Sequence, residues 1–292
     1  MKKVLVAGAT GYLGRYLVQE LKKQGYWVRA LARNTKKLED IKDSIDEIFV
    51  GEATKPETLN KICDGIDVII STIGITRQKD GLTYMDVDYQ GNKNLLELAI
   101  AENVSKFVFV SVFNAHKMGH LKGIEAKLLF EEQLKQSGLD YVIMRPTGFF
   151  SDMLEFLNMA KNGRVSVFGS GEDKINPIHG ADLAEACVKT ISESTKEINI
   201  GGPEIFTFNE IAELALSVQN KPIKISRLPL WMIKIILPLL RIFTSSKTYG
   251  PLEFMMTVMT MDVVGEKYGS HKLESLYREN VNNTAYTKTV NN

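Results

Sequence analysis

The first fourteen residues constrain the fold more than any other stretch of the chain. An apolar run at residues 4–7 (VLVA) ends at Gly8, and two further glycines, Gly11 and Gly14, follow within a segment of helical pattern. In this order Gly8 permits a sharp turn, Gly11 lets the backbone approach a pyrophosphate, and Gly14 lets a helix pack on the strand. Free N–H groups at the start of such a helix attract phosphate. The pattern predicts a dinucleotide site, and the simpler alternative is a tight structural turn.

Short runs rich in Val, Ile and Phe alternate along the first half of the chain with segments of helical spacing. We expect strands at 3–8, 26–32, 46–50, 66–71, 105–111 and 139–144. Strands that are apolar throughout are typical of a parallel sheet covered on both faces, and strand–helix alternation implies right-handed crossovers. The predicted fold is therefore α/β, a doubly wound parallel sheet (Rossmann fold), with a small mixed α/β C-terminal substrate lobe.

The 292 residues suffice for one large α/β domain with an appended lobe. We place a dinucleotide-binding core at 1–147 and a substrate-binding lobe with interleaved core elements at 148–279. The segment 280–292 is polar, rich in Asn and Thr and without a core-forming pattern, and we expect a loose tail there.

Composition excludes several classes of protein. Lys and Arg number 36 against 35 Asp and Glu, so no overall field favours nucleic acid. The two cysteines, Cys63 and Cys187, are too far apart in sequence to form a metal or redox pair. The N-terminus shows no signal-peptide pattern. We expect a cytoplasmic protein, a monomer or homodimer, with no metal site and no nucleic-acid partner.

The end of the second expected strand indicates which dinucleotide would bind. NAD sites usually carry an acidic residue there, about 20 residues after the glycine turn, to hold the ribose 2′-hydroxyl. Here residues 31–38 contain no carboxylate and the first one is Glu39, whereas Arg33 is placed to bind a 2′-phosphate, with Lys36 or Lys37 assisting. NADP(H) is therefore preferred, with NAD(H) possible. The alternative is that these cations are solvated charges at a helix start.

Several motifs, taken in order, resemble one family. They are 8–14 (GATGYLG), 32–34 (ARN), 88–92 (DYQGN), 145–147 (RPT) and 177–184 (PIHGADLA). Over residues 1 to about 220 the chain resembles the atypical short-chain dehydrogenase/reductases, in the subgroup of NmrA-like and isoflavone-reductase-like proteins. Residues 145–150 and 200–203 look most like divinyl chlorophyllide 8-vinyl reductases and their bacterial relatives.

The resemblance implies roles for particular residues. The pyrophosphate would be lined by Gly8, Thr10, Gly11, Tyr12, Leu13 and Gly14, and Arg33 would meet the 2′-phosphate. Residues 71–74, including Thr72, Ile73 and Gly74, would pass along the adenosine and ribose. Ser111 would lie near the nicotinamide, Pro146 and Thr147 would flank it, and Phe149 and Phe150 would wall the substrate pocket.

The catalytic pair is where this chain departs from the family. The family uses Tyr-x-x-x-Lys on one helix, whose four-residue spacing brings the ammonium beside the phenol. Here Gly123 replaces the tyrosine, while Lys127 is present to hold the ribose or to donate a proton. The alternative is an ordinary exposed lysine. Gly123 either marks the helix start or clears room for a bulky substrate. His116 or His120 could replace the donor, and His120 would share a face with Lys127 only if the helix reaches back that far.

The second half carries weaker signals. Helices are expected at 151–162 and at 207–219, the latter beginning with a capping box. His179 and Asp182 are interpreted as a structural bracket rather than as catalytic groups. The apolar run 228–243 is too short and too interrupted to span a bilayer. It is a membrane-surface helix making peripheral contact, a lid over a large apolar substrate, or a core or dimer-face helix.

Loss of the tyrosine leaves two functions open. Hydride transfer needs mainly orientation and a dry pocket, so reduction of a conjugated C=C, carbonyl or quinone-like group in a fairly large apolar substrate is the first hypothesis. The second is a non-catalytic NADP(H)-binding redox sensor or an accessory subunit of a protein complex.

Overall fold

The computed structural model describes residues 1–75, 81–244 and 246–290. The chain divides into two compact units. The first comprises residues 1–145 and 183–199, and the second comprises 146–182 and 200–292. The second unit thus begins two residues before the expected start of the substrate lobe, and one later segment returns to the first unit.

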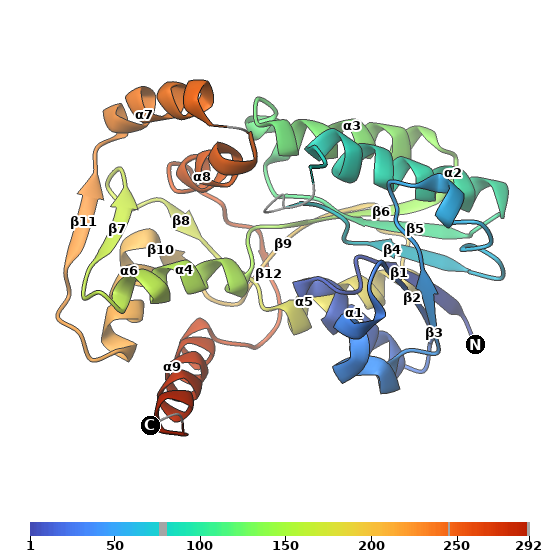
Figure 1. The fold of residues 1–292 in the computed structure, drawn as a ribbon, viewed down its shortest axis with the longest axis horizontal. Helices are drawn as coiled ribbons and strands as arrows, with labels where there is room; N and C mark the ends of the chain where they lie inside the picture. The colour runs from blue at the N-terminus through green and yellow to red at the C-terminus, as the bar shows by residue number, and fades with distance from the viewer. Residues whose placement is uncertain (76–80, 245, 291–292) are drawn as a thin grey trace. The chain divides into compact units, whose positions relative to one another are not determined.

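The main sheet has eight strands in the order β12-β9-β6-β5-β4-β1-β2-β3. They are β1 (Lys3–Ala7), β2 (Trp27–Ala32), β3 (Glu47–Val50), β4 (Val68–Ser71), β5 (Lys106–Val110), β6 (Asp140–Pro146), β9 (Glu197–Gly201) and β12 (Glu266–Lys267). Registered pairs such as β1 with β2 and β1 with β4 are parallel. The chain builds outward from β1 in one direction and then from β4 in the other (Figure 1). The predicted doubly wound fold is confirmed, and its switch point, where such folds bind ligands, lies between β1 and β4.

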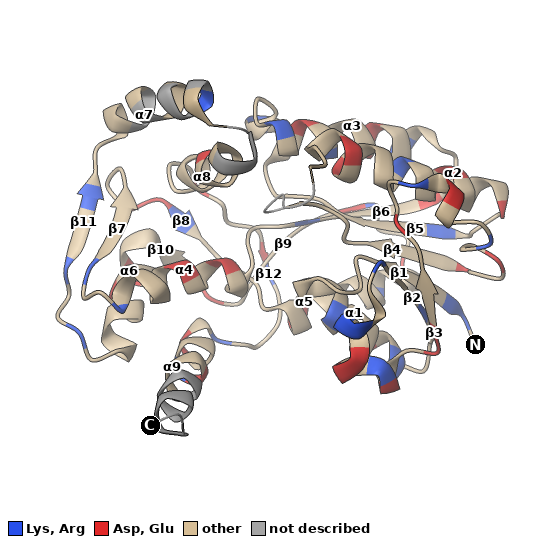
Figure 2. Ribbon diagram, viewed as in Figure 1, with Lys and Arg blue, Asp and Glu red and all other residues tan. Residues whose placement is uncertain are grey.

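Helical segments cover both faces of this sheet (Figure 1). They are α1 (Tyr12–Lys23), the 3₁₀ segments η1 (Thr35–Ser44), η2 (Pro56–Thr58), η4 (Ala115–Met118) and η5 (Thr190–Ser192), the π-helix η3 (Met85–Gly91), α2 (Asn92–Ala101), α3 (Lys122–Gln136) and α5 (Gly180–Lys189). The leucine spacing that predicted α1 reports its buried face, since Leu13, Leu17 and Leu21 are buried. Charges of both signs are interspersed along α3 (Figure 2), as expected of a helix with one face in solvent.

The second unit is a mixed α/β lobe. Its elements are α4 (Phe150–Ala160), β7 (Val165–Phe168), β8 (Lys174–Ile175), β10 (Phe206–Thr207), α6 (Phe208–Val218), β11 (Ile225–Leu228), α7 (Leu230–Phe243), α8 (Ser246–Val258) and α9 (Leu273–Val290). The predicted capping box is present, because the Thr207 hydroxyl accepts from the Glu210 N–H and the Glu210 carboxylate accepts from the Thr207 N–H. Helix α9 continues to residue 290, through most of the segment for which a loose tail was expected.

Helix α7 forms over the apolar run, with Pro238 inside it. Among the α7 side chains that the structure describes, Leu230, Trp231, Ile235 and Phe243 are exposed. Among the residues that the structure describes, no helix is long and apolar enough to cross a membrane.

Candidate cofactor-binding site

The glycine turn has the geometry that its sequence predicted. Gly8 has a φ of +88°, and a Cβ there would lie 2.4 Å from the Thr72 Oγ1. A Cβ on Gly14 would lie 2.1 Å from the Gly8 carbonyl oxygen, so only glycine lets α1 approach the turn. The Gly11 N–H donates to that oxygen at 2.9 Å. Gly11 is also the N-cap of α1, and no side chain caps the helix there. The first turn of α1 therefore offers its N–H groups to an anion.

The loop after β4 runs beside the turn and is held by buried polar groups. The Thr72 N–H donates to the Ala7 carbonyl at 2.9 Å. The Ser71 hydroxyl donates to the Asn92 side-chain oxygen and accepts from the Ile73 N–H. Ser71 and Asn92 are fully buried. These contacts fix the path of residues 71–74 at the carboxyl end of β4, where a bound dinucleotide would pass.

A buried ion pair lies against the same loop. The Lys127 Nζ is 3.1 Å from the Asp88 Oδ1, with side-chain exposures of 15% and 1%. The other Asp88 oxygen accepts from the Ile75 N–H at 3.0 Å. A Cβ on Gly74 would lie 2.8 Å from both the Asp88 Oδ1 and the Lys127 Nζ. Burial raises the pKa of Asp88, and the charge and hydrogen bond of Lys127 oppose that rise. Lys127 is therefore a positioned cation with a buried partner.

Position 123 lies at the helix start, the first of the two roles considered for its glycine. Helix α3 begins at Lys122, so Gly123 is its second residue. A Cβ there would lie 3.1 and 3.2 Å from the Cδ1 and Cε1 atoms of Tyr84. His120 precedes the helix and is exposed, and it therefore does not share a helix face with Lys127. His116 lies in η4 and is also exposed.

Ser111 follows β5 and is 3% exposed. Its backbone N–H donates to the Met144 carbonyl at 2.8 Å. Its hydroxyl is one of two buried side-chain atoms without a hydrogen-bond partner in the described part of the chain. A buried hydroxyl without a partner costs free energy unless a bound group satisfies it. The end of β5 thus offers a buried hydroxyl to a polar ligand, in addition to the glycine turn at the end of β1.

Arg33 follows β2, and its side chain is 58% exposed. Its Nη1 is 3.6 Å from the Glu52 Oε1, and Lys55 Nζ is 2.9 Å from the other oxygen of the same carboxylate. The side-chain hydrogen bond of Lys55 is the main cause that lowers the pKa of Glu52, and Arg33 contributes its charge. Lys36 and Lys37 are exposed. The carboxylate of Glu52 thus lies beside Arg33, the residue expected to bind the 2′-phosphate. The sequence did not reveal this contact.

Both cysteines are excluded as nucleophiles. Cys63 and Cys187 are buried free thiols. Burial raises the pKa of each to about 12, so neither forms a thiolate at neutral pH.

Residues 8–194 match the family model described as NAD(P)H-binding. The chain belongs to this family. The matched span covers the glycine turn, the Asp88–Lys127 pair and Ser111.

The relatives of this NAD(P)H-binding chain include proteins of different kinds. It is 30% identical over 234 residues to the photosystem II assembly factor Ycf39 of Guillardia theta, covering 79% of this chain and 74% of that one. It is 28% identical over 261 residues to the divinyl chlorophyllide a 8-vinyl-reductase of Arabidopsis thaliana, covering 81% of this chain and 62% of that one. The NADPH-dependent quinone oxidoreductase QOR2 of Escherichia coli shares its fold, with a TM-score of 0.73, 18% identity and coverage of 95% and 99%. The resemblance to atypical short-chain dehydrogenase/reductases is confirmed.

The remaining predicted residues belong to the second unit, apart from Arg145 of the 145–147 motif. Thr147 is buried, and its hydroxyl donates to the Asn176 carbonyl at 2.6 Å. Phe149 is the N-cap of α4 and is half-buried. Phe150 is 2% exposed and meets the His179 ring edge-on, so it belongs to the core of this unit. Pro146 ends β6.

The motif around His179 forms the bracket that the sequence suggested. The His179 ring stacks on the His271 ring with centroids 4.1 Å apart. The Asp182 carboxylate accepts from the backbone N–H groups of Ser270 and His271 and lies 2.7 Å from the His271 Nδ1. These bonds tie the start of α5 to the loop before α9. Burial, and then the nearby His271, lower the pKa of His179, which favours its neutral form.

Sequence reasoning missed two residues that contact α3. Asp88 was noticed only as part of a motif, although it is the residue that fixes the ammonium. Tyr84 was not singled out at all. The available signal was spacing, because residues 84 and 88 are separated by four, as are 123 and 127.

Proposed function

We propose that this chain is an NAD(P)H-dependent reductase that transfers a hydride to a fairly large apolar substrate with a conjugated C=C, carbonyl or quinone-like group. The observation that carries the proposal is the turn at Gly8, Gly11 and Gly14, which opens at an uncapped helix N-terminus beside the switch point of the sheet. The orphaned hydroxyl of Ser111 supports it, since a bound ligand would satisfy that group.

In this proposal each part of the cofactor meets a particular set of residues. The backbone of 8–14 and the dipole of α1 hold the pyrophosphate. Arg33 holds a 2′-phosphate, which favours NADP(H). Glu52 beside it is a carboxylate that could accept from the ribose 2′-hydroxyl of NAD(H). Lys127 binds ribose hydroxyls, and its ion pair with Asp88 fixes the position of the ammonium. When bound, NADPH supplies the hydride, and the protein supplies orientation and electrostatics.

The apolar substrate is inferred from side chains of the second unit. Phe149 is half-buried at the start of α4, and α7 exposes Leu230, Trp231, Ile235 and Phe243. Apolar side chains in such numbers on one helix suit a lid for an apolar ligand or a peripheral contact with a membrane surface.

The direct test is NADPH oxidation by the purified protein with a panel of enones, quinones and porphyrinoids, using small polar ketones as the comparison. We expect turnover with members of the apolar panel. Preference for small polar ketones would contradict the substrate proposal. The matched control is Gly14→Ala, in which the added Cβ clashes with the Gly8 backbone, and this variant should neither bind NADPH nor turn over.

A second candidate is a non-catalytic NADP(H)-binding accessory protein. The relative from Guillardia theta, described as an assembly factor, favours it, as does the glycine at position 123. This function predicts NADPH binding without turnover on any member of the panel, together with a stable protein partner in pull-down experiments.

A further inference from the structure

In the first unit, residues 84–88 and the start of α3 contact each other at two places four residues apart. Tyr84 directly precedes η3 and has helical backbone angles. Its ring lies against Gly123, and four residues further along both segments Asp88 pairs with Lys127. Residues four apart on a helix lie on the same face about one turn apart. Position 123, against which the Tyr84 ring lies, is therefore one helical turn before position 127 on the same side of α3.

Tyr84 contacts α3 at the position where the helix has no side chain, Gly123. A Cβ there would lie 3.1 Å from the Tyr84 ring, closer than ordinary van der Waals contact. A side chain at position 123 would therefore require the Tyr84 ring to move by a few tenths of an ångström. Gly123 thus does more than start the helix, because the Tyr84 ring from the neighbouring segment packs on its backbone, one turn before Lys127.

Lys127 itself is poorly suited to give up a proton. Its ammonium is the counter-charge of Asp88, whose side chain is 1% exposed. Loss of the Lys127 proton would leave that buried carboxylate without its counter-charge, which is strongly unfavourable. A separate proton donor leaves the Asp88–Lys127 pair intact, and a phenol is a chemically competent general acid.

We propose that the Tyr84 hydroxyl is the proton donor of the reduction, with Lys127 held as a fixed cation that stabilises the resulting phenolate. This inference rests on the proposed reductase function. In the step, the substrate carbon of C=X gains a hydride from NADPH, which is oxidised to NADP⁺. The O–H bond of Tyr84 breaks, its proton passes to X, and the product is HC–XH. Water then reprotonates the phenolate.

The first test needs no turnover. Tyrosine labelled with ¹³C at Cζ is incorporated into the full chain, and the Tyr84 resonance is assigned by its loss in Tyr84→Phe. NADP⁺ is then titrated. Tyr12, beside the glycine turn, reports cofactor binding, and Tyr141 on β6 serves as a reference. We expect both the Tyr12 and Tyr84 resonances to move while the Tyr141 resonance stays in place.

The outcomes of this titration distinguish failure of the donor role from failure of the proposed function. Movement of Tyr12 without Tyr84 would show that the cofactor binds away from Tyr84 and would overturn the donor role. If no resonance moves at saturating NADP⁺, the proposed function fails rather than this inference alone.

The second test measures NADPH oxidation with 9,10-phenanthrenequinone as the probe. Tyr84→Phe keeps the ring against Gly123 and removes only the hydroxyl, so kcat should fall by about 100-fold or more while the NADPH Kd stays unchanged. Tyr89→Phe, a change in the same segment, is the matched control and should leave kcat unchanged. A purely structural role for the Tyr84 ring predicts normal kcat in Tyr84→Phe.

A rescue experiment separates the phenol from its position. Tyr84→Ala should lose activity, and the double variant Tyr84→Ala, Gly123→Tyr should recover part of it, because the phenol then rises from α3 one turn from Lys127. The double variant Tyr84→Ala, Gly123→Phe restores a ring without a hydroxyl and should not recover activity. Equal recovery by both double variants would overturn the proposal.

Discussion

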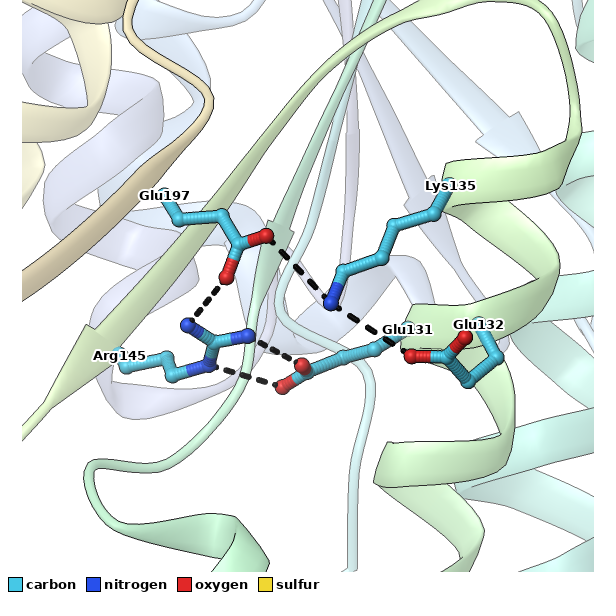
Figure 3. Close-up of polar contacts among 5 residues, drawn as sticks. All are labelled: Glu131, Glu132, Lys135, Arg145 and Glu197. Carbon is cyan, nitrogen blue, oxygen red and sulfur yellow. Dashed lines mark hydrogen bonds and ion pairs between the residues drawn. The ribbon is translucent and has the colours of Figure 1, made fainter.

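The main stability prediction concerns Arg145, a residue of β6 and the last residue of the first unit's segment 1–145. Its guanidinium donates to both oxygens of Glu131 on α3 and, through Nη1 at 2.7 Å, to Glu197 on β9 (Figure 3). The Glu131 side chain is 2% exposed, the Arg145 side chain 15% and the Glu197 side chain 39%. Arg145 therefore joins a helix and two strands through one buried carboxylate and one exposed one.

The loss of stability expected on replacing Arg145 follows from the burial of Glu131. Arg145→Met keeps the length of the side chain but leaves that carboxylate without its counter-charge, which should lower the free energy of unfolding by about 3–5 kcal/mol. At about 2–4 °C per kcal/mol for a unit of this size, the melting temperature should fall on the order of 10 °C. Glu197→Gln should cost less than about 1 kcal/mol, because that pair is largely solvated.

Urea unfolding gives the assay. Trp27 lies in the first unit and Trp231 in the second, so a Trp231→Phe background lets Trp27 fluorescence report the first unit alone. Adding Glu131→Gln to Arg145→Met should restore most of the lost stability, because no buried charge is then left unpaired. If Arg145→Met costs less than about 1 kcal/mol, or if Glu131→Gln fails to rescue it, the buried-charge reasoning is refuted.

Three further predictions follow from the site. Gly14→Ala should abolish NADPH binding, because its Cβ would meet the Gly8 backbone at 2.1 Å, and calorimetric binding at wild-type strength would contradict this. Arg33→Ala should weaken NADPH binding by about tenfold or more while sparing NADH, since a charged hydrogen bond contributes about 1.5–3 kcal/mol; equal losses for both would refute the 2′-phosphate role. Burial alone would raise the pKa of Glu197, but Arg145 and Lys135 lower it overall. The stability that Glu197 contributes is thus present above about pH 4.3 and lost as the pH falls through its lower folded pKa, so the stability difference between wild type and Glu197→Gln should shrink below that pH and would contradict the assignment if it grew.

The architecture was predictable because its signals are local. The bounds of the six strands expected from apolar runs lie within two residues of those of β1 to β6. The capping box of Thr207 and Glu210 correctly predicted the start of α6. The glycine turn was equally legible, since a positive φ at Gly8 and the close approach at Gly14 leave few alternatives to glycine.

The surroundings of Lys127 were less predictable because the contacts there join segments far apart in sequence. Asp88 and Lys127 are 39 positions apart and meet only after η3 packs on α3. Tyr84 could not be linked to Gly123 without the same packing. The glycines of the 200–203 motif have a further structural reason, since a Cβ on Gly201 would lie 2.2 Å from the Asn176 amide. That contact also joins residues distant along the chain.

Calorimetric titration of the purified chain with NADPH and then NADH tests the central claim, that the loop from Gly8 to Gly14 wraps a dinucleotide pyrophosphate. We predict saturable binding of NADPH, tighter than that of NADH, and loss of NADPH binding in Gly14→Ala. Absence of heat from either nucleotide at millimolar concentration would contradict both proposed functions together.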